Sequence, residues 1–156
     1  MKVLVAYYSR TGTTRRIAQE ISTLLECDIE EIQDMTNRSG LIGWLRSGRD
    51  AGARKLTTLK EIKNDPGLYD IVIVGTPIWN HSLSTPIRTY IAQCKDSFRE
   101  VAFFRTGYTA DDNPFEEMEL LSGKKPKATM KLQSKQEIEP DQHQEKLQEF
   151  IRQITR

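Results

Sequence analysis

The chain contains two short apolar runs that show no alternation with polar residues. Residues 3–8 read VLVAYY, and residues 69–75 read YDIVIVG. Both runs are rich in β-branched and aromatic residues, which is typical of central strands covered on both faces. Both are far shorter than the ~20 residues that a helical membrane span requires. We therefore predict buried strands over residues 2–8 and 69–75 and no membrane insertion.

Three further segments have the composition of strands. Residues 27–32 alternate weakly and end in polar Gln33 and Asp34, which favours a shorter strand at or near the edge of a sheet. Residues 100–105 and the segment that begins at residues 128–132 complete the set.

Helical periodicity appears between these strands. After a polar turn at residues 9–14, one apolar stripe is formed by Ile17, Ile21, Leu24 and Leu25. The same reasoning predicts helices over residues 86–94, from Pro114 to residue 121 and over residues 142–154.

Residues 35–63 are the least regular part of the chain. Four glycines interrupt this stretch, although Leu41, Trp44 and Leu45 could share one helical face. We expect one helix and a long connection here, with Trp44 in the core and without a functional role.

Strands that alternate with helices of this length pair in parallel through right-handed crossovers. The predicted fold class is therefore α/β, an open sheet with helices on both faces. A chain of 156 residues fits one domain over residues 1–156.

Charge and composition exclude several partner classes. With 23 basic and 22 acidic residues the net charge is only +1, so we expect no nucleic-acid partner. The locally basic stretch from Arg38 to Lys63 is interpreted as a solvated helix face. No apolar leader opens the chain, which favours the cytoplasm.

The few cysteines and histidines suggest no metal site. Cys27 and Cys94 have no metal-ligand spacing and are expected to be partly buried, reduced thiols. His81 is expected in a solvated loop, and His143 on the surface of the last helix.

The loop after the first strand carries the clearest chemical signal. Ligands of parallel α/β sheets bind at the carboxyl ends of the strands, where residues 9–14 read SRTGTT. Gly12 permits a tight turn, and the following helix start offers free N–H donors to a phosphate. Hydroxyls of Ser9, Thr11 and Thr14 would add donors. The alternative is that these hydroxyls simply cap the helix.

Other phosphate chemistries need residues that the chain lacks. There is neither a P-loop nor a three-glycine dinucleotide fingerprint. The loop has no cysteine nucleophile for a low-molecular-weight phosphatase. Ser9 and Thr76 stand where a response-regulator receiver needs acidic residues for magnesium and phosphate.

The residues SRTGTT resemble the phosphate-loop pattern [ST]-x-T-G-x-T of the flavodoxin family. Two further segments match that family by position. Residues 75–80, GTPIWN, resemble the loop whose aromatic residue packs on the isoalloxazine ring of FMN, with Trp79 at that place. Residues 106–112, TGYTADD, resemble a second flanking loop, with Tyr108 as candidate for the other face of the ring.

The resemblance implies a flavodoxin-like three-layer sandwich with a five-stranded parallel sheet of order 2-1-3-4-5. FMN would be the cofactor, over the ends of the first, third and fourth strands. The implied cofactor-binding residues are Ser9, Arg10, Thr11, Gly12, Thr13, Thr14, Thr76, Pro77, Ile78, Trp79, Asn80, Thr106, Gly107 and Tyr108.

Three functions are compatible with this resemblance. The first is FMN-dependent electron transfer between a redox protein donor and acceptor. The second is a small NAD(P)H-dependent quinone reductase in which His81 could contact substrate. The third is a flavodoxin-fold binding protein without redox work. Electron-shuttling flavodoxins are usually acidic, so the near-neutral net charge of this chain leaves the class of its partner open. The sequence also leaves the oligomeric state open.

Overall fold

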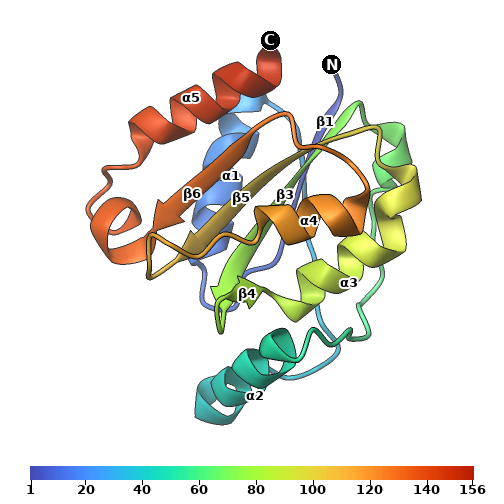
Figure 1. Ribbon diagram of the computed structural model, residues 1–156. Helices are drawn as coiled ribbons and strands as arrows, with labels where there is room; N and C mark the ends of the chain where they lie inside the picture. The colour runs from blue at the N-terminus through green and yellow to red at the C-terminus, as the bar shows by residue number, and fades with distance from the viewer.

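A central parallel sheet organises the molecule in the computed structural model, which describes residues 1–156 (Figure 1). Its strands are β1 (Val3–Tyr7), β2 (Asp28–Glu31), β3 (Ile71–Trp79), β5 (Glu100–Gly107) and β6 (Thr129–Gln133). Their spatial order is β2-β1-β3-β5-β6, and every neighbouring pair is parallel. Counted over the parallel strands, this is the predicted order 2-1-3-4-5, with the second strand at an edge.

Helices cover both faces of the sheet. Figure 1 shows α1 (Thr13–Leu25) and α5 (Gln144–Thr155) on one side, and α3 (Thr85–Cys94) and α4 (Phe115–Ser122) on the other. Helix α2 (Gly40–Gly52) lies below the sheet, beside α3 and the short strand β4 (Ser82–Leu83). The single helix expected within residues 35–63 is thus confirmed. Short helical turns occupy Pro66–Leu68, Lys95–Ser97 and Ser134–Ile138.

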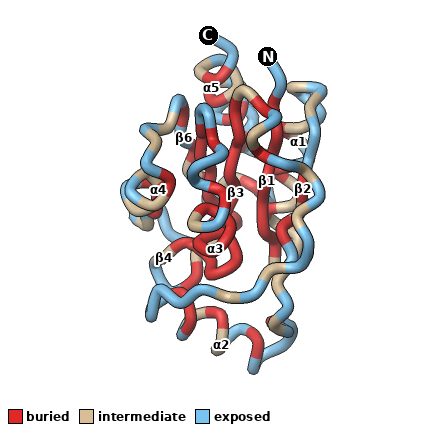
Figure 2. The backbone as a smooth tube through the Cα atoms, turned by 90° about the vertical axis from the view of Figure 1, so that its right-hand side faces the viewer, coloured by how far each residue is buried: buried red, intermediate tan, exposed pale blue.

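Two hydrophobic layers hold the helices to the sheet. On one face Ile17 of α1 and Phe150 of α5 pack against strand residues such as Val5. On the other face α3 and α4 pack against residues such as Val72. The central strands are buried throughout (Figure 2). Each fully buried aliphatic side chain stabilises the fold by about 1.5–3 kcal/mol. The two layers together therefore hold the strands, and the loops at their ends, in place.

The third strand is longer than the predicted residues 69–75, and a hairpin follows it. Strand β3 continues to Trp79, which pairs with Ser82 of the antiparallel β4. Asn80 and His81 form the two-residue turn, with φ of 46° and 61°. Such primed turns match the twist of a hairpin, and asparagine adopts their left-handed conformation readily. Trp79 therefore lies at a strand end.

The expectation that Trp44 belongs to the core is wrong. Its side chain is 56% exposed and Leu41 is 73% exposed, whereas the buried residues of α2 are Gly43, Ser47, Asp50 and Ala51. A Cβ atom on Gly43 would come within 2.1 Å of the Arg38 carbonyl carbon. Close backbone approach therefore turns the small and polar face of α2 inward and leaves its apolar face outside.

Two charged or titratable side chains also lie elsewhere than expected. Arg38 does not belong to a solvated helix face: its side chain is 2% exposed and forms ion pairs with Asp34 and with Asp50, the latter at 3.1 Å. His143 is fully buried rather than on the surface, because the residue before α5 faces α1, where Nε2 lies 2.7 Å from Glu20 Oε2.

The predicted partial burial holds for Cys27 but not for Cys94. Both are free thiols, Cys94 buried and Cys27 partly buried.

Candidate functional site

The loop Ser9–Thr14, here called the cradle loop, connects β1 to α1 at the carboxyl end of the sheet. Gly12 adopts φ 104° and ψ −10°, a conformation that side chains rarely reach. The Gly12 N–H donates to Ser9 Oγ at 3.0 Å, which closes the loop on itself. The turn therefore depends on glycine and on the serine hydroxyl together.

The first turn of α1 carries unpaired donors. No side chain caps this helix end, so the idea that the hydroxyls serve as caps is wrong. The N–H groups of Thr13 and Thr14 donate to no acceptor in the protein. A helix N-terminus with free N–H groups and the positive end of the helix dipole attracts an anion.

A small hollow of about 90 Å³ lies against the cradle loop. Thr14 and Thr106 meet at its inner wall, where their hydroxyl oxygens are 2.8 Å apart in a buried hydrogen bond. Arg10 supplies a cationic side chain to the wall, and Ser134, after β6, supplies a further hydroxyl. The polar part of the lining thus consists of hydroxyls and one guanidinium, without a carboxylate.

A larger cavity of about 460 Å³ continues from the small hollow. The two share four lining residues, which are Trp44, Ile78, Trp79 and Tyr108. The larger cavity runs on between α2, the tip of the β3–β4 hairpin and the loop after β5. Its size lies in the range of 300–1,000 Å³ that is usual for ligand sites.

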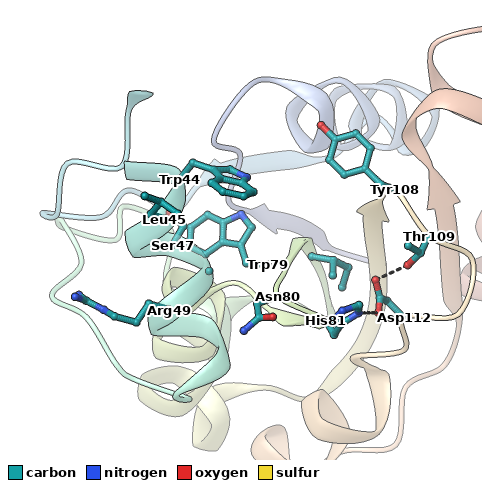
Figure 3. Close-up of a pocket in the computed structure, with 12 residues that line it drawn as sticks. Trp44, Leu45, Ser47, Arg49, Trp79, Asn80, His81, Tyr108, Thr109 and Asp112 are labelled. Atoms are coloured by element: carbon teal, nitrogen blue, oxygen red, sulfur yellow. Dashed lines mark hydrogen bonds and ion pairs between the residues drawn. The ribbon is translucent and has the colours of Figure 1, made fainter. Parts of the chain in front are cut away.

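Aromatic side chains form opposite sides of this cavity. Figure 3 shows Trp44 and Trp79 close together on one side and Tyr108 across from them. Trp79 is held from behind, because Tyr8 meets its ring edge-on at 5.3 Å and the Arg38 guanidinium lies 5.2 Å from its centroid. Tyr108 is 69% exposed and free to adjust. The cavity therefore offers a fixed indole and an adaptable phenol to a planar ligand.

A histidine and an aspartate lie at the far end of the cavity. His81 Nδ1 is 2.7 Å from Asp112 Oδ1, and Asp112 Oδ2 accepts a hydrogen bond from the Thr109 hydroxyl (Figure 3). Burial opposes the charge on Asp112, but the hydrogen bonds from Thr109 and His81 outweigh it and lower the pKa of this carboxyl. The pair is ionised on the aspartate side at neutral pH.

Most of the residues predicted for the site converge. Eleven of the fourteen line the small hollow. Asn80 lines only the larger cavity, and Gly12 and Thr76 line neither. Gly12 acts through the shape of the loop. The Thr76 hydroxyl instead accepts from the Ser84 N–H at 3.0 Å and secures the start of α3.

Sequence reasoning missed the contribution of α2, of Asp112 within the predicted flanking loop, and of Ser134 after β6. Trp44, Ser47 and Arg49 line the larger cavity from α2, Asp112 lines it from the loop after β5, and Ser134 lines the small hollow from the helical turn after β6. The available signal for α2 was the apolar set Leu41, Trp44 and Leu45, whose periodicity favours burial. Nothing in the sequence singled out Ser134.

Comparisons with known proteins agree with this geometry. A family model described as Flavodoxin matches residues 2–153. A sequence comparison with curated proteins gives no match. No helix combines the length and the apolar character that a membrane crossing needs.

Solved structures of similar shape are flavoproteins and flavodoxins. A flavoprotein from Lactobacillus acidophilus, crystallised in complex with FMN, superposes with a TM-score of 0.72 at 22% identity, over 83% of this chain and 92% of that one. Oxidised flavodoxin 1 from Bacillus cereus gives a TM-score of 0.60 at 16% identity, over 99% and 98% of the two chains. These likenesses show the fold.

Proposed function

This chain belongs to the flavodoxin family, and from that premise we propose that it binds FMN non-covalently and transfers electrons through it between redox protein partners. The observation that carries the proposal is the junction of two sites. A cradle of unpaired donors opens directly into a cavity walled by aromatic rings. A phosphate monoester attached to a planar ring system matches both halves.

The phosphate would lie in the small hollow. The unpaired N–H groups of Thr13 and Thr14 at the start of α1 can donate to a phosphate. The hydroxyls of Ser9 and Thr14 can also turn their hydrogens toward a phosphate oxygen. Arg10 offsets part of the negative charge. Donors from a helix end suffice for a dianion because they are pre-positioned and cost little reorganisation on binding.

The ring system would lie between Trp79 and Tyr108. Trp79 is immobilised by Tyr8 and Arg38, so its face presents a preformed stacking surface. Tyr108 can close over the ligand from the exposed side. Bound FMN would accept and release electrons at this ring.

Transfer to a protein partner requires access to the ring. The exposed side chains of Tyr108 and Trp44 border the cavity mouth, so a partner docked there would reach the ring edge. Leu41 and Arg49 of α2 are also exposed and give this border a mixed apolar and basic character. Such a border suits a partner with an apolar centre and an acidic rim.

The first experiment is an FMN titration of the apoprotein, followed by anaerobic stepwise reduction of the complex. We expect quenching of tryptophan fluorescence on binding and reduction in two separate one-electron steps. Reduction in a single two-electron step would favour a reductase instead. If no FMN is bound even at high concentration, the proposal fails and a non-redox binding protein remains.

A variant pair tests the position of the phosphate. Thr14→Val removes a hydroxyl from the small hollow, and the loss of a hydrogen bond to a charged group should weaken FMN binding about 10- to 100-fold. Thr89→Val is the control, because the Thr89 hydroxyl is also buried and bonded, to the Thr57 N–H, but lines neither cavity. Both variants should lose stability, and only the first should lose affinity.

A further inference from the structure

Three arginine side chains are buried in the interior of this protein, those of Arg38, Arg88 and Arg105. Arg38 and Arg88 each form an ion pair with at least one carboxylate. Arg105 is fully buried, and it bonds to no carboxylate. A buried charge without a bonded counter-charge is costly to a fold. The burial of Arg105 therefore requires an explanation.

The hydrogen-bond partners of Arg105 are backbone carbonyls. Nη1 donates to the Leu132 oxygen at 3.2 Å, Nη2 donates to the Ala110 oxygen at 2.9 Å, and Nε has no partner. Carbonyl dipoles satisfy these donors but leave the charge of the guanidinium uncancelled. The two bonds also place the guanidinium between β6 and the loop after β5, which carries Tyr108.

Negative charge near Arg105 comes from Asp112 and Glu137, which act on it without forming an ion pair. Both carboxylates are bonded elsewhere, Asp112 to His81 and Glu137 to Lys146. Burial lowers the pKa of Arg105, and the two carboxylates oppose that effect only in part. Because an arginine stays protonated in proteins even so, this side chain keeps a positive charge that is incompletely compensated.

Arg105 lies next to the proposed FMN site without being part of its lining. The two residues that follow it, Thr106 and Gly107, both line the small hollow. A Cβ atom on Gly107 would lie 3.3 Å from Arg105 Nη1 and 3.2 Å from Cγ1 of Ile78, which lines both cavities. The guanidinium therefore lies immediately behind the wall on which Gly107 and Ile78 border the site.

The charge of the FMN ring changes on reduction, whereas the charge of the phosphate does not. The oxidised ring is neutral. Two electrons from the donor protein, taken up in successive steps, and one proton from solvent leave the ring with one negative charge. A fixed positive charge held in a dry site stabilises this reduced ring and acts little on the neutral oxidised ring.

We propose that Arg105 stabilises the negative charge that the FMN ring gains on reduction and thereby raises the reduction potential of the bound cofactor. The inference rests on FMN binding as proposed above, and it adds an electrostatic role for a residue that lines neither cavity. Arg105 is not a catalytic residue, because it acts through its field across the backbone of Gly107. A site with this charge accepts electrons from weaker reductants than the same site without it.

A purely structural role is the competing explanation. Arg105 joins the loop after β5 to β6 through the Ala110 and Leu132 carbonyls. If it acts only through these bonds, its replacement displaces the loop and weakens the binding of oxidised and reduced FMN equally. The reduction potential then stays the same. The ratio of the two affinities therefore separates the two explanations.

The test measures two quantities on the FMN-loaded full chain. Fluorescence titration gives the dissociation constant of oxidised FMN, and anaerobic equilibration with a redox dye of known potential gives the reduction potential. Together they give the dissociation constant of reduced FMN, because binding and reduction form a closed thermodynamic cycle.

Arg105→Met removes the charge and keeps an unbranched apolar side chain in the space. We expect the preference for reduced over oxidised FMN to fall about tenfold, the order that one unit charge contributes across a protein interior, and the two-electron potential to fall by about 30 mV. Arg105→Gln is a second neutral variant and should give the same shift. Arg105→Lys keeps the charge but loses the fork that bonds both carbonyls, and its preference should stay within about threefold of the parent.

Arg88→Met is the matched control. Arg88 is also buried, but it is ion-paired with Glu117 and lines neither cavity. Its replacement should destabilise the protein and leave the preference for reduced FMN within about twofold of the parent. A shift equal to that of Arg105→Met would show that any lost buried cation has the same effect and would contradict the proposal.

The outcomes separate this inference from the proposed function. A protein that binds no FMN would overturn the proposed function and this inference with it. A protein that binds FMN, but whose potential is unchanged in Arg105→Met and Arg105→Gln, would overturn the inference alone. Equal shifts in Arg105→Lys and Arg105→Met would assign the effect to the carbonyl bonds rather than to the charge and would also overturn it.

Discussion

Replacing Gly12 with alanine tests the backbone geometry of the cradle loop without removing a side chain. A Cβ on Gly12 would lie 3.8 Å from the nearest atom, an Arg15 nitrogen, so the substitution causes no clash. The cost comes from φ 104°, which an L-residue avoids. A left-handed conformation costs about 1–2 kcal/mol outside glycine, so the apoprotein should lose stability of that order.

The same strain should also weaken FMN binding. In the free Gly12→Ala protein the loop can relax toward negative φ, which turns the donors of the loop away from the hollow. Binding must then restore the strained geometry. If about 1.4 kcal/mol of the strain is relieved in the free protein, the dissociation constant of FMN rises tenfold.

Gly123→Ala is the matched control. Gly123 also has positive φ, 66°, and no atom lies within 4 Å of its added Cβ, but it ends α4 and lines neither the small hollow nor the larger cavity. Urea unfolding of the apoproteins gives the stability changes, and fluorescence titration gives the affinities. Our reasoning is refuted if Gly12→Ala binds FMN within twofold of the parent, or if Gly123→Ala weakens binding equally.

Three further predictions concern stability and reactivity. Arg38→Leu leaves Asp34 and Asp50 without their buried cation and should cost about 3–5 kcal/mol in urea unfolding, whereas Arg49→Ala, which removes a solvent-exposed partner of the same Asp50, should cost less than about 1 kcal/mol. The Arg88 hydrogen bond is the main cause that lowers the pKa of Glu117. The resulting stabilisation is complete above the unfolded pKa of about 4.3 and is lost as the pH falls through the folded pKa, so Glu117→Gln should flatten the decline of the urea midpoint between pH 5 and pH 3. Burial raises the pKa of Cys27 and of Cys94 to about 11, so iodoacetamide should alkylate both thiols of the folded protein at pH 8 far more slowly than those of the urea-unfolded chain.

The sequence pattern predicted the sheet and its helices well, because their signals are local. Short runs rich in β-branched and aromatic residues, such as VLVAYY, favour a buried strand, and the stripe of Ile17 and Ile21 gives α1 one face to bury. The hairpin after β3 was missed because its turn is Asn80-His81, without the glycine that usually marks a primed turn. Pairing with β5 carries the extended chain past Gly75, where the apolar run ends.

The residues predicted at strand ends lie together in the structure, whereas the part that α2 contributes to the cavity was not predicted. Parallel strands bring their carboxyl ends to one edge, so the cradle loop, Trp79 and Tyr108 had to meet. Periodicity identifies an apolar face but not the direction in which it points. In α2 the close approach of Gly43 to Arg38 decides the direction, and that contact depends on tertiary structure.

Helix α2, whose apolar face points outward, is joined to the aromatic wall of the cavity through Arg38. The inner face of α2 is attached by the ion pair between Asp50 and Arg38, and the same Arg38 guanidinium supports the Trp79 ring. Its outer face leaves Trp44 exposed at the cavity mouth. An apolar face turned to solvent lowers stability unless a ligand or partner covers it, and such local violations of the folding rules concentrate at functional sites. Arg38 therefore couples the position of α2 to the position of the stacking indole, and loss of this one cation should loosen both walls of the FMN site together.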